Sequence, residues 1–241
     1  AIKEYLSTYQ ISHFIAIPSL YHALLDCCQS KDLASLEVIT LAGEKLTREV
    51  VEKSNQLKPE LEIYNEYGPT ESSVVTTCYQ VTDSNYIPIV QPVDNTRVYI
   101  VDDNLQLQPI GVPGELCIAG KGLADRYVNR PQLTADKFVA PTSIEEERIY
   151  RTGDRAKWLP DGNIQFLGRV DEQVKLRGYR IELGEIENVI LDYELVTEAV
   201  VTFQEDEQTS SLCAYYVPEE EFLQNDLEDY LKDSLPDYMI P

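Results

Sequence analysis

Four polar motifs that contain glycine follow one another along this chain and hold most of the side chains that could do chemistry. They begin at Asn65, Gly114, Tyr150 and Gly168 and are written, in order, NEYGPTE, GELCIAG, YRTGD and GRVDEQVKLRG. Their hydroxyl, carboxylate and guanidinium groups are types that bind phosphates, sugar hydroxyls and hard divalent cations. Each motif alone is a weak signal, so the information lies in the order in which they occur.

The first motif offers an aromatic ring, a hydroxyl and a carboxylate within five residues. Tyr67 lies in a turn after a strand, where its ring could rest against a base such as adenine or simply pack over the sheet edge. Thr70 could bind a phosphate oxygen or cap the next segment. Glu71 supplies a hard oxygen ligand for Mg²⁺, or satisfies a helix N-terminus. From these residues alone, both interpretations stay open for each side chain.

The third and fourth motifs add a carboxylate and a guanidinium group. Asp154 follows a glycine at an expected strand end, where its carboxylate could accept hydrogen bonds from two vicinal ribose hydroxyls or form an Asx turn. Arg169 could pair with phosphate or ribose oxygens as a planar fork, or be an exposed charge at a strand end. Phe166 is first of all an apolar strand position.

The elements that must position these residues follow from hydrophobic patterning. We expect strands at 13–17, 36–41 and 61–64, and helices at 19–29 and 47–57, the second capped by Thr47. Alternating strands and helices predict a mainly parallel sheet covered by helices. In such sheets ligands bind beyond the carboxyl ends of the strands. Gly43, Glu44 and the turn that begins at Tyr67 follow strand ends, so a site is expected there.

The rest of the chain has a different pattern. Four short β-rich runs between about Asn95 and Arg169 (97–101, 115–119, 156–159 and 164–167) predict a small antiparallel sheet or distorted barrel. The charged stretch 169–177 is expected to be a linker or hinge, and an incomplete α+β lobe follows it. The predicted class is therefore α/β, with domains at 1–170 (1–94 α/β, 95–170 β-rich) and 171–241.

Composition narrows the possible partners and the compartment. The formal charge of -22 argues against a nucleic-acid backbone or an anionic membrane surface as partner. No apolar run is long enough to span a bilayer. The five cysteines form no CxxC pair and only two histidines are present, which argues against a zinc site. Cysteines in apolar stretches favour a reducing, cytoplasmic compartment.

In this order the four motifs strongly resemble the adenylation domains of nonribosomal peptide synthetases, within the superfamily of adenylate-forming enzymes. The resemblance extends from about His13 to Pro241. It implies an enzyme that joins an amino acid to Mg·ATP as an aminoacyl adenylate and passes the aminoacyl group to a phosphopantetheine thiol on a carrier domain. It also implies a phosphate loop upstream of Ala1 and a catalytic lysine downstream of Pro241, so this piece alone is expected to be inactive.

The resemblance also implies a role for particular positions. Catalytic roles go to Thr70, Glu71 and Arg169, and Glu71 is the metal ligand. The expected nucleotide contacts are Gly43, Glu44, Tyr67, Asp154, Phe166 and Arg169. Asp171 and Lys175 are expected at the hinge between the lobes.

The amino-acid pocket is partly readable in the same way. Its matching positions are Ala16, Thr40, Ala42, Glu66, Val74 and Val75. Small side chains with one carboxylate imply a roomy apolar pocket with a hydrogen-bond acceptor at one end, which would suit a phenol, and the set resembles pockets for tyrosine. Glu66 could instead face solvent or pair with an amino side chain.

Two other functions stay open at this point. One is an acyl- or aryl-CoA ligase of the same superfamily, which amino-acid-dependent pyrophosphate exchange would distinguish. The other is a non-catalytic nucleotide-binding module. The presence of Glu71, Asp154 and Arg169 together argues against that module, because a purely structural unit would not require all three.

Overall fold

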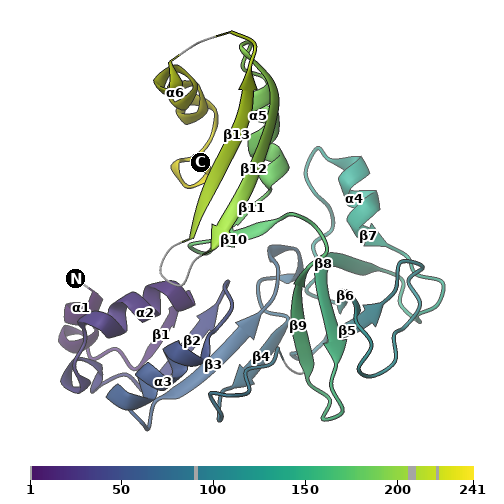
Figure 1. The fold of residues 1–241 in the computed structure, drawn as a ribbon. Coiled ribbons are helices and arrows are strands. Elements are labelled where there is room, and N and C mark those ends of the chain that lie inside the picture. The colour runs from purple at the N-terminus through teal and green to yellow at the C-terminus, as the bar shows by residue number, and fades with distance from the viewer. Residues whose placement is uncertain (1, 90–91, 206–209, 221–222) are drawn as a thin grey trace. The chain divides into compact units, whose positions relative to one another are not determined.

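A computed structural model describes residues 2–89, 92–205, 210–220 and 223–241 of the chain (Figure 1). It contains two compact units, Ala1–Asp171 and Glu172–Pro241. The sequence-based boundary, between residues 170 and 171, differs from this division by one residue. Each unit has its own hydrophobic core. The mixed α/β class predicted from the sequence is confirmed.

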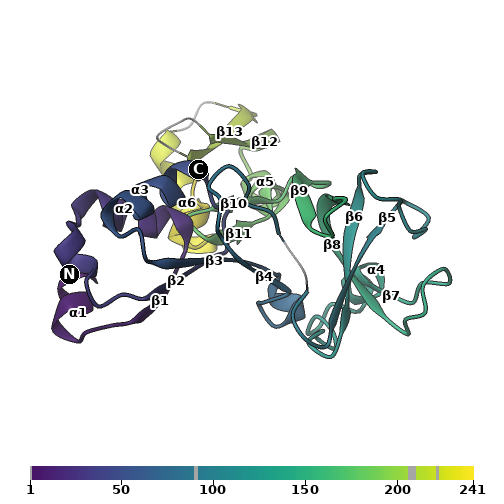
Figure 2. The same cartoon turned by 90° about the horizontal axis from the view of Figure 1, so that it is seen from below.

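The first sheet of the larger unit has the order β1-β2-β3-β4. Its strands are β1 (His13–Ala16), β2 (Val38–Ala42), β3 (Glu62–Tyr67) and β4 (Thr77–Gln80). The first three are parallel, as predicted, and β4 is an antiparallel addition. Helices α2 (Pro18–Cys27) and α3 (Arg48–Leu57) lie on the same side of this sheet (Figure 2). The helix α1 (Ile2–Thr8) and the 3-10 turn η1 (Ser30–Leu33) were not predicted.

Alternation along the strands decides which residues face the helices. In β2, Ile39 and Leu41 are fully buried among the helices, whereas Thr40 and Ala42 point to the other face. In α3, Val50, Val51 and Ser54 form the buried stripe that packs on the sheet. Thr47 occupies the N-cap position of this helix, as predicted, but its hydroxyl makes no capping hydrogen bond.

The second sheet of the larger unit is antiparallel, with the order β5-β6-β8-β7 and β9 paired to β8. The strands are β5 (Thr96–Val101), β6 (Gly114–Gly120), β7 (Phe138–Val139), β8 (Ile149–Trp158) and β9 (Ile164–Arg169). The prediction that a strand begins at residue 156, with Asp154 at a strand end, is wrong, because β8 runs through Asp154. The reason is Gly153, since a glycine usually indicates a break in a strand. In the structure Gly153 takes a φ of +74° and the strand continues through it. The helix α4 (Pro131–Lys137) was not predicted.

The smaller unit contains a hairpin, a two-stranded sheet and two helices. Its elements are β10 (Val174–Leu176), β11 (Tyr179–Ile181), α5 (Leu183–Leu191), β12 (Val196–Glu205), β13 (Ser210–Pro218), α6 (Gln224–Ser234) and the turn η3 (Asp237–Met239). The charged stretch 169–177, expected to be a linker or hinge, thus includes the strand β10 in its second half. Arg177 and Gly178 both have positive φ, +52° and +80°, which closes a tight β-hairpin. An arginine at the first turn position gave no hairpin signal in the sequence.

Candidate nucleotide site

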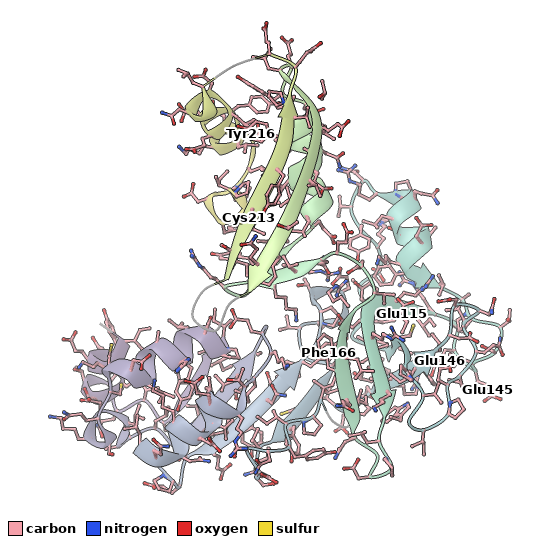
Figure 3. The ribbon with its side chains drawn as sticks, in the orientation of Figure 1. Glu115, Glu145, Glu146, Phe166, Cys213 and Tyr216 are labelled. Atoms are coloured by element: carbon pink, nitrogen blue, oxygen red, sulfur yellow. The ribbon has the colours of Figure 1, made fainter. Side chains whose placement is uncertain are left out.

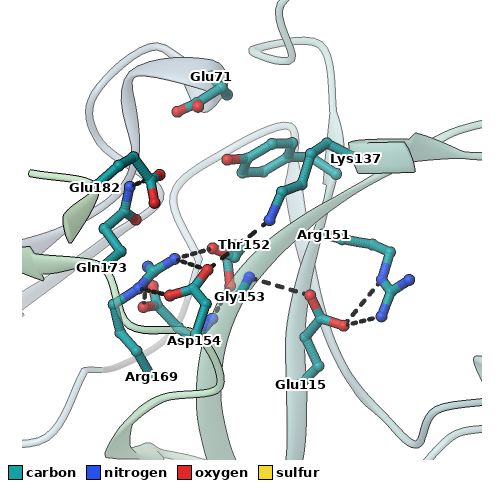
Figure 4. Close-up of polar contacts among 12 residues, drawn as sticks. Glu71, Glu115, Lys137, Arg151, Thr152, Gly153, Asp154, Arg169, Gln173 and Glu182 are labelled. Carbon is teal, nitrogen blue, oxygen red and sulfur yellow. Dashed lines mark hydrogen bonds and ion pairs between the residues drawn. The ribbon is translucent and has the colours of Figure 1, made fainter. Parts of the chain in front are cut away.

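Asp154 is the centre of a buried polar cluster in the larger unit. Its side chain is 6% exposed. The Tyr67 hydroxyl donates to one carboxylate oxygen at 2.5 Å. The Arg169 guanidinium donates to the other at 2.7 Å (Figure 4). These residues come from β3, β8 and β9, so three of the four motifs or their flanks contribute to the cluster. The fold thus brings together three residues expected at a nucleotide site.

Arg169 distributes its donors over several acceptors. Besides Asp154, the guanidinium binds both oxygens of Asp171, at 2.6 and 2.7 Å. It also donates to the carbonyl oxygen of Thr152 at 3.2 Å (Figure 4). Lys137 lies 4.0 Å from the Asp171 carboxylate, at the outer limit of an ion pair. A planar fork can serve two carboxylates in this way because its donors have fixed directions.

The two predicted hinge residues lie in different compact units. Asp171 is the last residue of the larger unit, where Arg169 holds it. Lys175 belongs to the smaller unit and lies in β10, opposite Arg180 of β11. The chain therefore passes from one unit to the other between these two positions, and their role as a hinge stays a prediction.

Residues that the sequence analysis did not single out form further hydrogen bonds next to this cluster, between β6 and β8. The Gly153 N–H donates to Glu115 at 3.1 Å, and Arg151 grips the same carboxylate through two donors at 2.9 and 2.6 Å (Figures 3 and 4). The Thr152 hydroxyl donates to the carbonyl oxygen of Leu116 at 2.7 Å. The second and third motifs are therefore in contact through Glu115. The signal that could have predicted this contact is the opposite charge of Glu115 and Arg151.

Glycine at position 153 also avoids a steric conflict with two side chains of the cluster. A Cβ at this position would lie 2.7 Å from both the Arg169 guanidinium and the Asp171 carboxylate. Its φ of +74° adds a second restriction, since residues with a Cβ rarely adopt that conformation. The glycine thus leaves room for Arg169 and Asp171 to meet over β8.

Tyr67 and Phe166, the two residues expected on the faces of adenine, are neighbours in one apolar cluster. Their ring centroids are 6.5 Å apart and the rings are tilted by 43°, so they do not form parallel walls. Phe166 lies on β9 (Figure 3). Burial raises the pKa of Tyr67 well above its ordinary value, and the neighbouring Asp154 charge raises it further. The Tyr67 hydroxyl therefore stays a hydrogen-bond donor to Asp154.

Glu71 lies in the short turn η2 (Thr70–Ser72), and Thr70 is exposed. The Tyr127 hydroxyl donates to the Glu71 carboxylate at 2.6 Å, and the Glu71 carbonyl oxygen accepts from the Ala124 N–H at 2.8 Å. Burial, followed by the hydrogen bond to Glu71, raises the pKa of Tyr127 far above its ordinary value. Tyr127 thus orients Glu71 and links it to the segment before α4.

The donor set at Glu71 fits a magnesium ion that is shared with a nucleotide. Across the described residues, no three His, Cys, Asp or Glu side chains gather in a cluster that could hold a metal. Magnesium usually needs only one or two protein carboxylates and completes its shell with phosphate oxygens and water. Glu71 would be the protein ligand in that arrangement.

Gly43 and Glu44 lie at the end of β2, where the sequence predicted a site. Gly43 has a φ of +87° and turns the chain away from the strand. The Glu44 carboxylate accepts from the Ser19 N–H at 2.9 Å and from the Ser19 hydroxyl at 3.0 Å. In the structure Glu44 therefore stabilises the first turn of α2, as an anion near a helix N-terminus does. Its contact with a nucleotide stays a prediction.

The structure brings part of the expected amino-acid pocket together. Thr40, Ala42 and Glu66 share the face of the first sheet that the helices leave uncovered. Ala16 pairs with Leu41 and lies on the opposite, helix-covered face.

The two valines expected in the pocket follow the turn η2, outside the strands. Val74 is 61% exposed and has a φ of +72°, a strained conformation for a β-branched residue. Val75 is half-buried. The place of both valines in the pocket stays a prediction.

Two family models match the chain. An AMP-binding enzyme model matches residues 1–128, and an AMP-binding enzyme C-terminal domain model matches residues 185–241. In the described part of the chain, no helix is both long and apolar enough to cross a membrane.

Relatives and solved structures agree with these models. Gramicidin S synthase 2 from Aneurinibacillus migulanus is 53% identical over 100% of this chain and 6% of its own length. Tyrocidine synthase 1 from Brevibacillus parabrevis is 45% identical over 100% of this chain and 22% of its own length. The structure of PA1221, a nonribosomal peptide synthetase protein with adenylation and carrier (PCP) domains, matches with a TM-score of 0.85 and 28% identity over 100% of this chain and 49% of that chain.

The chain therefore spans a small part of the curated relatives that it matches. These matches confirm the resemblance to peptide-synthetase adenylation domains that the four motifs indicated. The family model that covers more than half of the chain decides the assignment, and the chain belongs to the AMP-binding enzyme family.

Proposed function

We propose that this chain is part of an adenylation domain that activates an amino acid for nonribosomal peptide synthesis. In the first half-reaction a carboxylate oxygen of the amino acid attacks the α-phosphorus of ATP. The bond between the α- and β-phosphates breaks and pyrophosphate leaves. In the second, a phosphopantetheine thiolate of a carrier domain attacks the carbonyl carbon and AMP leaves. The family match and the likeness to gramicidin S synthase 2 support this proposal.

The buried cluster of Tyr67, Asp154 and Arg169 is the observation that carries the proposal. A carboxylate has about four acceptor positions, and the described hydrogen bonds to Asp154 fill two of them. Asp154 therefore keeps acceptor capacity for ribose hydroxyls. Arg169 supplies positive charge where negative charge develops on the phosphate, which is the type of stabilisation that lowers a phosphoryl-transfer barrier most.

The proposed cofactors are ATP and Mg²⁺, with phosphopantetheine supplied by the carrier domain. Glu71 would hold the metal, which when bound neutralises charge on the phosphates. Tyr127 keeps the Glu71 carboxylate oriented for that task. Thr70, exposed in the same turn, would offer its hydroxyl to a phosphate oxygen.

A carrier protein domain is the proposed partner of the second half-reaction. The PA1221 structure, which contains adenylation and carrier domains, supports this pairing. The proposed location is the cytoplasm, where the five free cysteines would stay reduced.

The test is amino-acid-dependent exchange of pyrophosphate into ATP. Because the relatives are much longer than this chain, residues 1–241 should replace the matching segment of tyrocidine synthase 1. The resulting chimera is then assayed with each proteinogenic amino acid, beside residues 1–241 alone. We expect exchange from the chimera with one or a few amino acids and none from residues 1–241 alone, because the phosphate loop and the lysine that the resemblance implies would come from the tyrocidine synthase 1 part of the chimera.

The outcomes separate the competing functions. Exchange with tyrosine would support the pocket inferred from the resemblance, and exchange with another amino acid would keep the function and refute that preference. Activity with acyl or aryl acids and coenzyme A, and none with amino acids, would favour the CoA-ligase alternative. Nucleotide binding without any activation would favour the non-catalytic module.

A further inference from the structure

On the uncovered face of the first sheet, the strand register places Glu66 beside one residue of each neighbouring strand. The register aligns Ala42 of β2, Glu66 of β3 and Cys78 of β4 in a single row. Partners in such a row point to the same face of the sheet. Ala42 carries only a methyl group, so the functional group beside Glu66 in this row is the Cys78 thiol.

The neighbouring row does not compete for the Glu66 carboxylate. Tyr64, two residues earlier on the same face of β3, donates its hydroxyl to Glu62 at 3.0 Å. The register places the Cys78 thiol beside the Glu66 carboxylate, and after burial each group is the next influence on the pKa of the other. Both side chains are half-buried, so neither is fully solvated. A weak donor on one side and a methyl group on the other leave most of the acceptor capacity of Glu66 unused.

We propose that Cys78 is a positioning residue for the amino-acid pocket. Cys78 holds the Glu66 carboxylate in place, so that the carboxylate can accept a hydrogen bond from a donor at the end of the substrate side chain. The inference rests on the proposed function and adds a residue outside the pocket set that the family resemblance implies. The substrate class is an amino acid whose side chain ends in a hydroxyl, amide or ammonium group. A thiol suits this task because it occupies one acceptor position weakly and adds little volume.

The pairing itself can be tested on residues 1–241 without any enzymatic activity. Burial and the Glu66 charge raise the pKa of the Cys78 thiol. Glu66→Gln should therefore increase the rate at which iodoacetamide alkylates Cys78 roughly three- to tenfold at fixed pH, because more thiolate is present. Peptide mass spectrometry follows each cysteine separately, with the half-buried Cys213 of the smaller unit as internal reference.

Glu62→Gln is the matched control for this measurement. Glu62 lies on the same strand, but its carboxylate binds the Tyr64 hydroxyl. We expect Cys78 to react at the wild-type rate in this variant. Equal Cys78 rates in wild type and Glu66→Gln, or the same acceleration in both variants, would overturn the pairing.

The role in the pocket is tested in the chimera with tyrocidine synthase 1. Substrates are compared as pairs that differ in the terminal donor: tyrosine against phenylalanine, and lysine against norleucine. Cys78→Ala should lower the preference in kcat/KM for the donor-bearing member of the favoured pair about two- to tenfold. Cys78→Ser, which keeps a donor, should retain most of the preference, and circular dichroism melts verify that both variants fold.

Each result of this second experiment has one meaning. An unchanged preference in Cys78→Ala, or a wild-type chimera that favours neither member of either pair, would overturn the inference while the proposed function stands. A wild-type chimera that exchanges with no amino acid would overturn the proposed function and the pocket role together.

Discussion

The Tyr67 hydroxyl donates a 2.5 Å hydrogen bond to the Asp154 carboxylate across 87 residues of sequence. This bond joins the parallel sheet, through β3, to the antiparallel sheet, through β8. Arg169 completes the group from β9. The larger unit therefore has a charged pair and a phenol buried where its two sheets meet. The same three residues are the proposed nucleotide contacts, so stability and function depend on one cluster.

Replacement of Asp154 by alanine should destabilise the larger unit. The change leaves the Arg169 guanidinium buried with fewer partners and removes the carboxylate that accepts from the Tyr67 hydroxyl, which typically costs roughly 3–5 kcal/mol. Trp158, at the end of the same strand and the only tryptophan of the chain, reports unfolding in urea by fluorescence. Asp136→Asn, an exposed carboxylate in α4, is the control and should change stability by less than about 0.5 kcal/mol. Equal effects of the two changes would contradict this account.

Gly153→Ala should cost more stability than Gly162→Ala. Both glycines have similar positive φ, +74° and +83°, so the conformational penalty is nearly the same. A Cβ at Gly153 meets the Arg169 and Asp171 side chains, whereas a Cβ at Gly162 meets nothing within 4 Å. The difference between the two variants in urea unfolding isolates the steric conflict in the cluster. We expect roughly 1 kcal/mol for Gly162→Ala and a clearly larger loss for Gly153→Ala; two equal losses would refute the crowding argument.

Tyr127→Phe should weaken the use of Mg·ATP by the chimera. The change removes the hydroxyl that orients Glu71 and keeps the ring. Loss of one such hydrogen bond predicts an increase in KM for Mg·ATP of about three- to tenfold. Tyr86→Phe is the matched control, because its hydroxyl binds the exposed Asp161 and is not part of the proposed site. An unchanged KM in Tyr127→Phe would argue against Glu71 as the metal ligand.

Glu66→Gln should increase the free energy of unfolding relative to wild type, and this increase should be larger at pH 7 than at low pH. Burial raises the pKa of Glu66 above its ordinary value of 4.5. The folded state therefore favours the protonated form of Glu66. The protonated acid contributes fully to the free energy of unfolding below pH 4.5, and this contribution is lost as the pH rises through the pKa of Glu66 in the folded state. Glutamine avoids that loss. Urea unfolding of both proteins at pH 7 and pH 4 checks the prediction, and a difference that does not depend on pH would contradict it.

The sequence by itself determined the family, the α/β class and most residues of the central cluster. The pattern of apolar runs was enough for β1, β2, β3 and the helices between them, because buried parallel strands and amphipathic helices leave strong signals. The family matches agree with what the four motifs indicated. A motif such as NEYGPTE is informative because its polar side chains (Asn65, Glu66, Thr70 and Glu71) have no apolar packing role in common.

Other features depended on contacts between distant residues, which local patterns do not encode. The sequence did not reveal that β8 continues through Gly153, since a positive φ inside a strand has no periodic signature. It did not reveal that the Glu44 carboxylate accepts hydrogen bonds from Ser19, and the expected nucleotide contact of Glu44 stays a prediction. Only the strand register placed Ala16 on the helix-covered face and Cys78 beside Glu66. Residue types thus predicted which chemistry is available, and strand pairing decided which of those groups meet.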